Sequence, residues 1–541
     1  MSGLRGFLGR LFGRMASASV PSTPAGAGVF GELTNLYDYE LPEKLDAAFT
    51  GSGDSAIAAV RRMAGLLAEV RTDDLPRVEV RIRSAWRLAS RRPDSVDTLL
   101  ENARSSGADV LGVVSFHANG FVREAAVNGL ATLRDGSELR YLFLRLNDWV
   151  PPVRIAAHRA VLDRLGVDSA SAVAASLPLI GRLARLPYED RASLIARLAQ
   201  VLATGGGAAL AATLASSWGE TSRLVVRFAI DHVPDALPEM VRRGVSAPDL
   251  VIRKWVTPLV VPALPADAAL PVLQRLAADS SSLVRREAFL ALQRAFPHDA
   301  EPFLRGGLLD ASAAVREISR FLLREQHLDF SILYQAALRD GSNAHQLATA
   351  LTGLAETGTA SDADHAAPYL FHPSPRVRRA AVKSVMTLAG EAFADRVVAM
   401  LQDRSRAVSA AARNALRSHA PAVGRDRLME LFAGATVPHT REHLIPLLAA
   451  LSKWQSITAL VHVAAAGGEA ATAAEGKVAS LAHACIRDWN RNYNRSQATP
   501  TRTEIEQLVA ALTAAGESLD ESIATEIRFA IQGLSITDRK A

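Results

Sequence analysis

The clearest pattern along the chain is a short phrase of apolar and polar positions that recurs every 31 residues. An Asp is followed, after four residues, by Val-Arg, then by a small residue four positions after the Val and an apolar residue four positions later. Apolar residues at i, i+4 and i+8 lie on one stripe of an α-helix, and the small residue lets a neighbouring helix approach. The copies begin at Asp279 (Val284-Arg285, Ala288, Leu292), Asp310 (Val315-Arg316, Ser319, Leu323), His372 (Val377-Arg378, Ala381, Val385) and Asp403 (Val408-Ser409, Ala412, Leu416).

The same register extends over most of residues 110 to 435. Val122-Arg123 and Val153-Arg154 are 31 residues apart, and a degenerate copy fills the position around residue 346. Between Val153 and Val284 the distance is 131 residues, slightly more than four repeats, so we expect a short insertion near Gly205-Gly206-Gly207. Weaker helices are expected in between, at Leu194 to Leu202, Leu224 to Ile230 and Val251 to Leu259.

Each repeat is long enough for two short helices, which cannot bury their apolar faces unless neighbouring repeats stack. The phrase resembles the short HEAT-like repeats of phycobilisome-lyase-related and other bacterial proteins. This resemblance implies an all-α fold, an α-solenoid of stacked helical hairpins. It also implies that Asp and Arg form a ladder between adjacent repeats, which gives a structural role to Arg123, Arg154, Arg285, Arg316 and Arg378.

Composition changes at both ends of the repeat region. We predict an amphipathic basic segment at residues 1–15, a flexible linker of small residues, Pro and Gly at 16–31, the solenoid at 32–465 and a C-terminal helical cap region at 466–541. Thr503-x-x-Glu506 and Ser518-x-x-Glu521 match capping boxes, which would open the last two helices.

The first fifteen residues place apolar side chains on one arc of a helix, with arginines on its flanks. Gly6, Gly9 and Gly13 lie opposite, and each interior Gly costs about 1 kcal/mol of helix stability. We therefore expect a helix that forms only against a surface: an anionic membrane or the groove of a partner, with a transit peptide or an idle tail as alternatives. The residues are Leu4, Phe7, Leu8, Leu11 and Phe12, flanked by Arg5, Arg10 and Arg14.

The overall composition limits the possible fold classes and the cellular compartments in which the protein would work. Ala, Leu and Arg favour helix, and an aromatic content of 6% argues against a β-sandwich or barrel. The single Cys excludes a disulfide framework and fits a reducing compartment, so we expect a cytoplasmic protein with membrane association through residues 1–15. No apolar run is long enough to predict a membrane span.

Positive charge is concentrated in residues 376–427, which carry eleven basic and four acidic side chains. Such a patch suits an acidic protein or phosphates. A second candidate is the polar stretch around Trp489 and Tyr493, whose rings either stack on a base or pack a loop onto the last repeat. The candidate partner patch comprises Arg376, Arg379, Lys383, Arg404, Arg406, Arg413, Arg417, Trp489, Arg491 and Tyr493.

Motifs for catalysis and cofactors lack the context that would give them a mechanism. Gly26-Ala-Gly28-Val-Phe-Gly31 matches a dinucleotide fingerprint but lies in the linker, without a preceding strand. His439-Thr-Arg-Glu442-His443 matches H-x-x-E-H, yet no third ligand can be named. We weigh Asp148-Trp149 because alkylpurine DNA glycosylases use similar repeats, but the chain is much longer than that family's fold. No catalytic residue, metal or cofactor is therefore predicted.

These observations favour a non-enzymatic scaffold or adaptor that presents a solenoid groove to a protein partner and is tethered by its first fifteen residues. The alternative is a nucleic-acid-binding solenoid that uses residues 376–427. A lyase or chaperone for a chromophore-bearing protein, or a glycosylase-like enzyme, rests on repeat resemblance alone.

Overall fold

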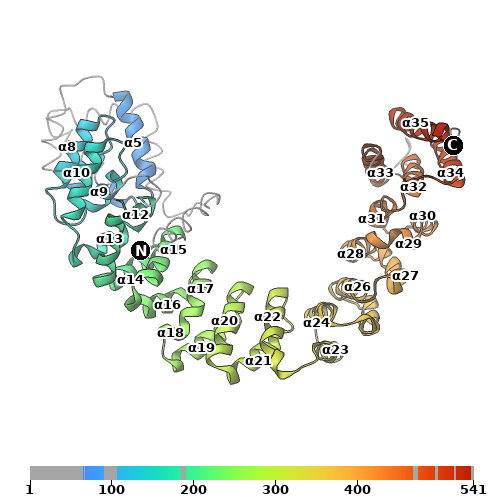
Figure 1. Ribbon diagram of the computed structural model, residues 1–541, viewed down its shortest axis with the longest axis horizontal. Coiled ribbons are helices and arrows are strands. Elements are labelled where there is room, and N and C mark those ends of the chain that lie inside the picture. The colour runs from blue at the N-terminus through green and yellow to red at the C-terminus, as the bar shows by residue number, and fades with distance from the viewer. Residues whose placement is uncertain are drawn as a thin grey trace. The chain divides into compact units, whose positions relative to one another are not determined.

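The computed structural model describes residues 65, 67–89, 107–183, 191–217, 219–466, 473–493, 498–516 and 519–537. These residues form two compact units, Met1–Ala295 (unit 1) and Phe296–Ala541 (unit 2). Within this part of the chain all regular structure is helical and no strand occurs (Figure 1). The predicted all-α solenoid is confirmed.

Unit 1 consists of short helices joined by tight turns. Its α-helices are α5 (Leu75–Ala89), α7 (Ala108–Val114), α8 (Gly120–Leu130), α9 (Leu139–Arg145), α10 (Pro151–Leu162), α11 (Ala170–Ala175), α12 (Leu177–Leu183), α13 (Arg191–Gly205), α14 (Gly207–Ser216), α15 (Gly219–His232), α16 (Leu237–Gly244), α17 (Leu250–Val256), α18 (Val260–Ala263), α19 (Ala266–Leu276) and α20 (Ser282–Ala295). Its 3₁₀ turns are η2 (Val167–Ser169), η3 (Pro234–Ala236) and η4 (Thr257–Leu259).

Unit 2 also consists of short helices joined by turns. Its α-helices are α21 (Pro297–Gly307), α22 (Ala313–Leu323), α23 (Phe330–Asp340), α24 (Ala344–Thr357), α25 (Ala363–Ala366), α26 (Pro375–Ala389), α27 (Ala394–Ala399), α28 (Arg406–Leu416), α29 (Ala420–Val423), α30 (Arg425–Ala433), α31 (Pro438–Leu448), α32 (Lys453–Ala465), α33 (Ala473–Arg491), α34 (Arg502–Ala515) and α35 (Glu521–Thr537). Its 3₁₀ turns are η5 (Arg324–Gln326), η6 (Ala360–Asp362), η7 (Ala367–Phe371), η8 (Gly390–Phe393), η9 (Met400–Gln402) and η10 (Arg417–His419).

The repeated apolar stripe forms the core of both units. In α28, for example, Val408, Ala412 and Leu416 are all fully buried. The helix that carries the stripe is the second of each repeat, and successive second helices of unit 2 pack on one another: α24 on α26, α26 on α28, α28 on α31 and α31 on α33. Figure 1 shows these second helices on the inner side of the bend that unit 2 makes.

The Asp of the phrase shapes the turn that leads into the second helix. Oδ1 of Asp403 accepts a hydrogen bond from the backbone N–H of Ser405 at 2.7 Å, and Asp310 does the same for Ser312 at 2.8 Å. Each of these serines is the residue immediately before its helix. The carboxylate therefore fixes the entry turn and leaves the first N–H groups of the helix itself to other acceptors.

Two local expectations can be compared with the structure, and the first of them is wrong. The capping box that opens α34 is formed by Thr501 and Glu504, two residues earlier than predicted, because the helix already begins at Arg502. The glycine run near residue 206 does interrupt the helices: Ala196–Gly205 and Gly207–Ser216 meet at 96°. In the described part of the chain no single helix is long and apolar enough to span a membrane, and only this bent pair passes that test when taken together.

Candidate partner-binding surfaces

An Arg–Asp ladder joins neighbouring repeats. Nε and Nη2 of Arg378 donate to the two carboxylate oxygens of Asp403 at 2.7 and 2.8 Å, and Arg123 binds Asp148 in the same way, with both distances 2.8 Å. Nη1 of each Arg donates to the backbone carbonyls five and six residues before it. One guanidinium group thus donates hydrogen bonds both to the carbonyls in the turn of its own repeat and to the Asp of the next repeat. Its charge therefore stabilises the stacking of the two repeats.

The electrostatics of this pair follow from its hydrogen bonds. Burial raises the pKa of Asp403, but the hydrogen bonds from Arg378 and from the backbone N–H of Ser405 outweigh it and hold the pKa below its usual value. The hydrogen bond to Asp403 in turn raises the pKa of Arg378. Both groups are therefore ionised together at neutral pH.

The other ladder arginines named from the sequence make part of the same set of contacts. Arg154 donates to the carbonyl of Asp148 at 2.8 Å, and Arg285 donates to that of Asp279 at 2.7 Å. Arg316 donates to its own turn and also to Glu356, with Nε 3.1 Å from Oε2. The degenerate repeat around residue 346 has Gly341 where the next Asp would stand, so a carboxylate from α24 replaces it.

Two further ladder arginines escaped the sequence analysis. Arg223 binds Asp249 at 2.6 and 3.2 Å, and Arg253 binds Asp279 at 2.8 and 3.1 Å. Both lie in the region of weak repeats, where the residue before the Arg is not Val. The signal that identifies them is an Asp 26 residues further along, close to the 25 residues that separate Arg378 from Asp403.

A cationic row lies on the exposed side of two packed second helices. Neither α26 nor α28 contains an acidic residue. Three exposed basic side chains of α26 stand at i, i+3 and i+7 on one side of the helix, and further basic residues lie on α28, at its end and in the loop before it. We define the cationic row as Arg376, Arg379, Lys383, Arg404, Arg406, Arg413 and Arg417, all exposed except the half-buried Arg413.

Few of these charges are neutralised within the described structure. Arg406 pairs with Glu442 at 2.5 Å, and Nη2 of Arg376 lies 2.6 Å from Nδ1 of His345. Every other member of the row lacks a carboxylate within ion-pair distance among the described residues. These members are Arg376, Arg379, Lys383, Arg404, Arg413 and Arg417. The row is therefore a positive surface beside Arg378, whose own charge is neutralised by Asp403.

The H-x-x-E-H sequence is used for packing. His439 and His443 are both buried on α31, with Nε2 of His439 3.0 Å from the carbonyl of Asp403 and Nδ1 of His443 2.7 Å from Oγ of Ser409. The carboxylate of Glu442 points to Arg406 and Lys477 instead. Burial, together with Arg413 and the other nearby positive groups, lowers the pKa of His443 to about 4.

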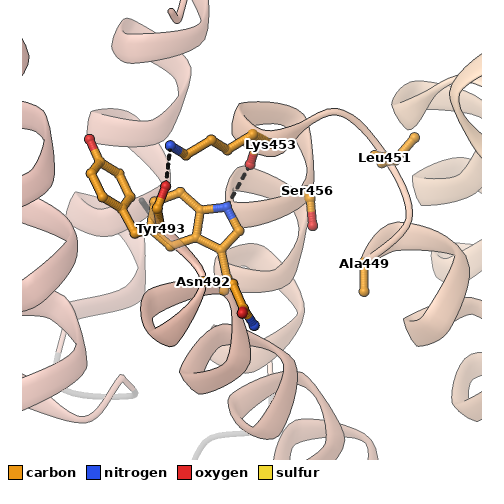
Figure 2. Close-up of a pocket in the computed structure, with 7 residues that line it drawn as sticks. Ala449, Leu451, Lys453, Ser456, Asn492 and Tyr493 are labelled. Carbon is orange, nitrogen blue, oxygen red and sulfur yellow. Dashed lines mark hydrogen bonds between the residues drawn. The ribbon is translucent and has the colours of Figure 1, made fainter. Parts of the chain in front are cut away.

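Trp489 and Tyr493, the second candidate site, belong to an aromatic cluster between α32 and α33. Both rings meet Trp454 edge-on, with centroids 5.7 and 6.1 Å away. Nε1 of Trp489 donates to the carbonyl of Lys453 at 2.8 Å, and Nζ of Lys453 donates to the carbonyl of Tyr493 at 2.8 Å (Figure 2). The cluster fastens the end of α33 to α32; Arg491 is exposed beside it.

A shallow pocket opens beside this cluster (Figure 2). Its volume is about 250 Å³. Nζ of Lys453 lies 3.8 Å from the centre of the Tyr493 ring, and burial lowers the pKa of this Lys. Its ammonium group is thus engaged by the cluster rather than directed at a ligand. The lining residues are Ala449, Leu451, Lys453, Ser456, Trp489, Asn492 and Tyr493.

Asp148, weighed above with Trp149 for a resemblance to DNA glycosylases, is inaccessible. It is 2% exposed, and its oxygens accept hydrogen bonds from Arg123, from Arg145 at 2.9 Å and from the backbone N–H of Val150 at 3.0 Å. Burial raises its pKa, but these donors lower it below its usual value. The tether segment, residues 1–15, lies outside the described residues.

Comparison with known proteins gives no family. No family model and no curated protein matches the chain. Similar structures include a chain of the Kap95:Nup1 complex (11% identity, TM-score 0.32, covering 96% of this chain and 81% of that one). Importin beta in an ammonium sulfate condition is 13% identical (TM-score 0.30, covering 98% and 80%), and a chain in a homology model of the full-length AP-3 complex is 12% identical (TM-score 0.35, covering 95% and 99%). These similarities concern helical-repeat architecture alone.

The stacked helix pairs and the Arg–Asp ladder define the class of the protein. It is a HEAT-like α-solenoid. Its surface features are a cationic row on the second helices of unit 2 and an aromatic cluster near the end of that unit.

Proposed function

We propose that the protein is a non-enzymatic, cytoplasmic scaffold that binds an acidic segment of a protein partner on the cationic row. The observation that carries this proposal is the contrast between neighbouring arginines on α26. Arg378 is neutralised by Asp403, whereas Arg379, the next residue, is exposed and has no carboxylate partner among the described residues. The ladder uses the first charge for stability, whereas an exposed charge such as the second contributes little to the fold and is available to a partner.

The expected partner chemistry follows from the charges. Two adjacent helices with no acidic residue produce a positive surface that attracts acidic segments and accelerates their association. Binding should weaken as salt rises, because exposed charges are screened beyond about 10 Å at 0.1 M salt. The 31-residue repeat supports a further proposal, that these are short repeats of the phycobilisome-lyase-like type.

The test combines charge reversal with gentle crosslinking in the source cells. A tagged full chain is purified with and without nuclease, next to the triple variant Arg379→Glu, Lys383→Glu, Arg417→Glu. We expect a stoichiometric protein that survives nuclease and is lost from the triple variant. The matched control reverses three exposed arginines of unit 1, Arg275, Arg286 and Arg294, and should retain the partner.

Two outcomes would contradict the proposal. If the partner stays with the triple variant, the cationic row is not the binding surface. If nucleic acid is recovered and the proteins disappear on digestion, the solenoid binds nucleic acid through residues 376–427.

We also propose that residues 1–15 tether the scaffold to an anionic membrane surface. The support is the sequence: an apolar arc, arginine flanks and no acidic residue before Glu32. Deleting residues 1–15 should abolish flotation with liposomes that contain anionic lipid and leave thermal unfolding unchanged. A variant with the fifteen residues in scrambled order keeps their composition and is the control: it should float poorly if the apolar arc matters. Flotation that survives the deletion would reject the tether.

A further inference from the structure

Trp149 in unit 1 is an exposed aromatic ring held by two arginines. It lies in the turn between α9 and α10, and 52% of its surface is exposed. The guanidinium carbons of Arg83 and Arg123 lie 4.3 and 4.2 Å from the centre of its ring. Cation–π contacts at this distance fix the ring without covering it, so a rigid, half-exposed indole is presented to solvent.

The charges behind this ring do not balance. Asp148 accepts hydrogen bonds from Arg123 and Arg145, and Glu79 accepts from Arg145 and Arg83. Three guanidinium groups therefore share two carboxylates. Nε of Arg83 and Nε of Arg145 are buried, and neither has a hydrogen-bond partner in the described structure. Burial, only partly offset by Glu79 and reinforced by the other arginines, lowers the pKa of Arg83 to about 10. Among the residues that the structure describes, the cluster therefore holds one more positive charge than negative charges.

Exposed apolar side chains lie on the elements that adjoin Trp149. The backbone of Gly120 lies against Val150, since a Cβ placed on this glycine would be 3.3 Å from Cγ2 of that valine. This contact brings the start of α8 beside the start of α10. Phe121, which follows Gly120, is 81% exposed, and Ile155 on α10 is 58% exposed. Val80, one turn before Arg83 on α5, is 65% exposed. Single exposed apolar residues are ordinary, but a group of them around a fixed Trp and an Arg has the composition of a binding hot spot.

We propose that this Trp149 patch (Val80, Arg83, Phe121, Trp149 and Ile155) binds a protein segment in which a carboxylate stands next to an apolar or aromatic side chain. The carboxylate would compensate the excess charge at Arg83, and the apolar side chain would cover the exposed part of Trp149. This site is independent of the cationic row, because it lies in unit 1 and uses different chemistry.

A nucleic acid fits the patch less well. A strand of phosphates needs a run of cations along its path, with aromatic rings at intervals. Here the excess among the described charges in contact with one another behind the ring is a single positive charge, and the large exposed apolar residues on the adjoining helices are Val80, Phe121 and Ile155. A peptide with one acidic residue among apolar ones matches both features.

The experiment uses the full chain as bait for a displayed library of random twelve-residue peptides. We expect enrichment of peptides that carry Asp or Glu beside an aromatic or aliphatic residue. A selected peptide, synthesised with a fluorophore, is then titrated by anisotropy. Trp149→Ala should weaken its binding by about tenfold or more, as for other aromatic hot spots. Phe121→Ser alters a residue that is almost entirely exposed, so the fold is retained, and it should weaken binding as well.

The matched control is Phe321→Ala. Phe321 of unit 2 is also 52% exposed and also has an arginine over its ring, with the guanidinium carbon of Arg324 3.9 Å away. Its loss should leave binding unchanged. The proposal is overturned if no peptide is enriched, if the selected peptides lack the acidic–apolar pair, or if Trp149→Ala and Phe121→Ser both leave binding intact. A labelled oligothymidine whose binding depends on Trp149 would replace the protein partner with single-stranded nucleic acid.

Discussion

Two rungs of the Arg–Asp ladder provide a natural comparison, because they make the same hydrogen bonds at different depths. Arg123 and Arg378 each bind an Asp through two hydrogen bonds and two backbone carbonyls through Nη1. The side chains of the Arg123–Asp148 pair are both 0% exposed, whereas those of Arg378 and Asp403 are 16% and 7% exposed. The perturbation is Arg→Met at each site, which keeps most of the apolar stem and removes the charge.

The expected loss differs because the partner left behind differs. Arg123→Met leaves Asp148 paired with Arg145 but takes two hydrogen bonds from it, and it removes a donor from the backbone carbonyls of His117 and Ala118. Each buried acceptor that loses its partner costs about 1–3 kcal/mol, so we expect a total loss of about 3 kcal/mol. Asp403 can reach water when Arg378 is replaced, and we expect a loss of about 1–2 kcal/mol there.

Hydrogen exchange followed by mass spectrometry measures both effects on the full chain, region by region. Amides of α8 and α10 should exchange about 100-fold faster in Arg123→Met, and amides of α26 and α28 about 5- to 30-fold faster in Arg378→Met, since about 1.4 kcal/mol corresponds to a factor of ten. Equal acceleration of exchange at the two sites, or a larger effect at Arg378, would refute the reasoning that burial determines how much an Arg–Asp pair contributes to stability.

Three further changes test the packing of unit 2. Gly353→Ala would place a Cβ 2.1 Å from Cε1 of the buried Tyr334 and should destabilise unit 2 by about 1–3 kcal/mol in urea unfolding. Gly306→Ala, whose Cβ would have nothing within 4 Å, should stabilise unit 2 by up to about 1 kcal/mol. Equal effects of the two substitutions would argue against overpacking at Gly353. Burial lowers the pKa of His443 to about 4 from an ordinary 6.5, so the unfolded chain binds more protons between these values. Stability present above pH 6.5 should be lost as pH falls toward 4, by up to about 3 kcal/mol, and His443→Gln should flatten the unit 2 part of a urea-midpoint profile against pH; an unchanged slope would show that another group titrates. Trp489→Phe removes a 2.8 Å hydrogen bond to a backbone carbonyl and should cost about 1 kcal/mol, seen as faster exchange in α33; unchanged exchange there would show that ring packing alone holds the helix.

The Arg–Asp ladder shows which contacts between repeats can be predicted from the sequence repeat and which cannot. The Val-Arg phrase identified Arg123 and Arg378 because the Val, the Arg, the small residue and the apolar residue keep their spacing there, although His117 and His372 stand in the Asp position. Arg223 and Arg253 escaped because their apolar partners vary, and only the contact with an Asp of the next repeat identifies them. Arg316 needed a substitute carboxylate from α24, which no spacing rule predicts. Ladder contacts join residues of different repeats, so they are visible in sequence only where both repeats are regular.

The sequence by itself determined the helical class, the length of the repeat and the stripe of Val, small residue and Leu that forms the core, because helix periodicity and burial are local consequences of residue order. It also located the basic stretch of residues 376–427. Only the tertiary structure decided that the second helices of unit 2 lie on the inner side of its bend, that Trp489 and Tyr493 pack on Trp454, and that Trp149 stands exposed between two arginines. These features depend on which side of each helix the neighbouring helices cover, and that is settled by packing between elements rather than within them.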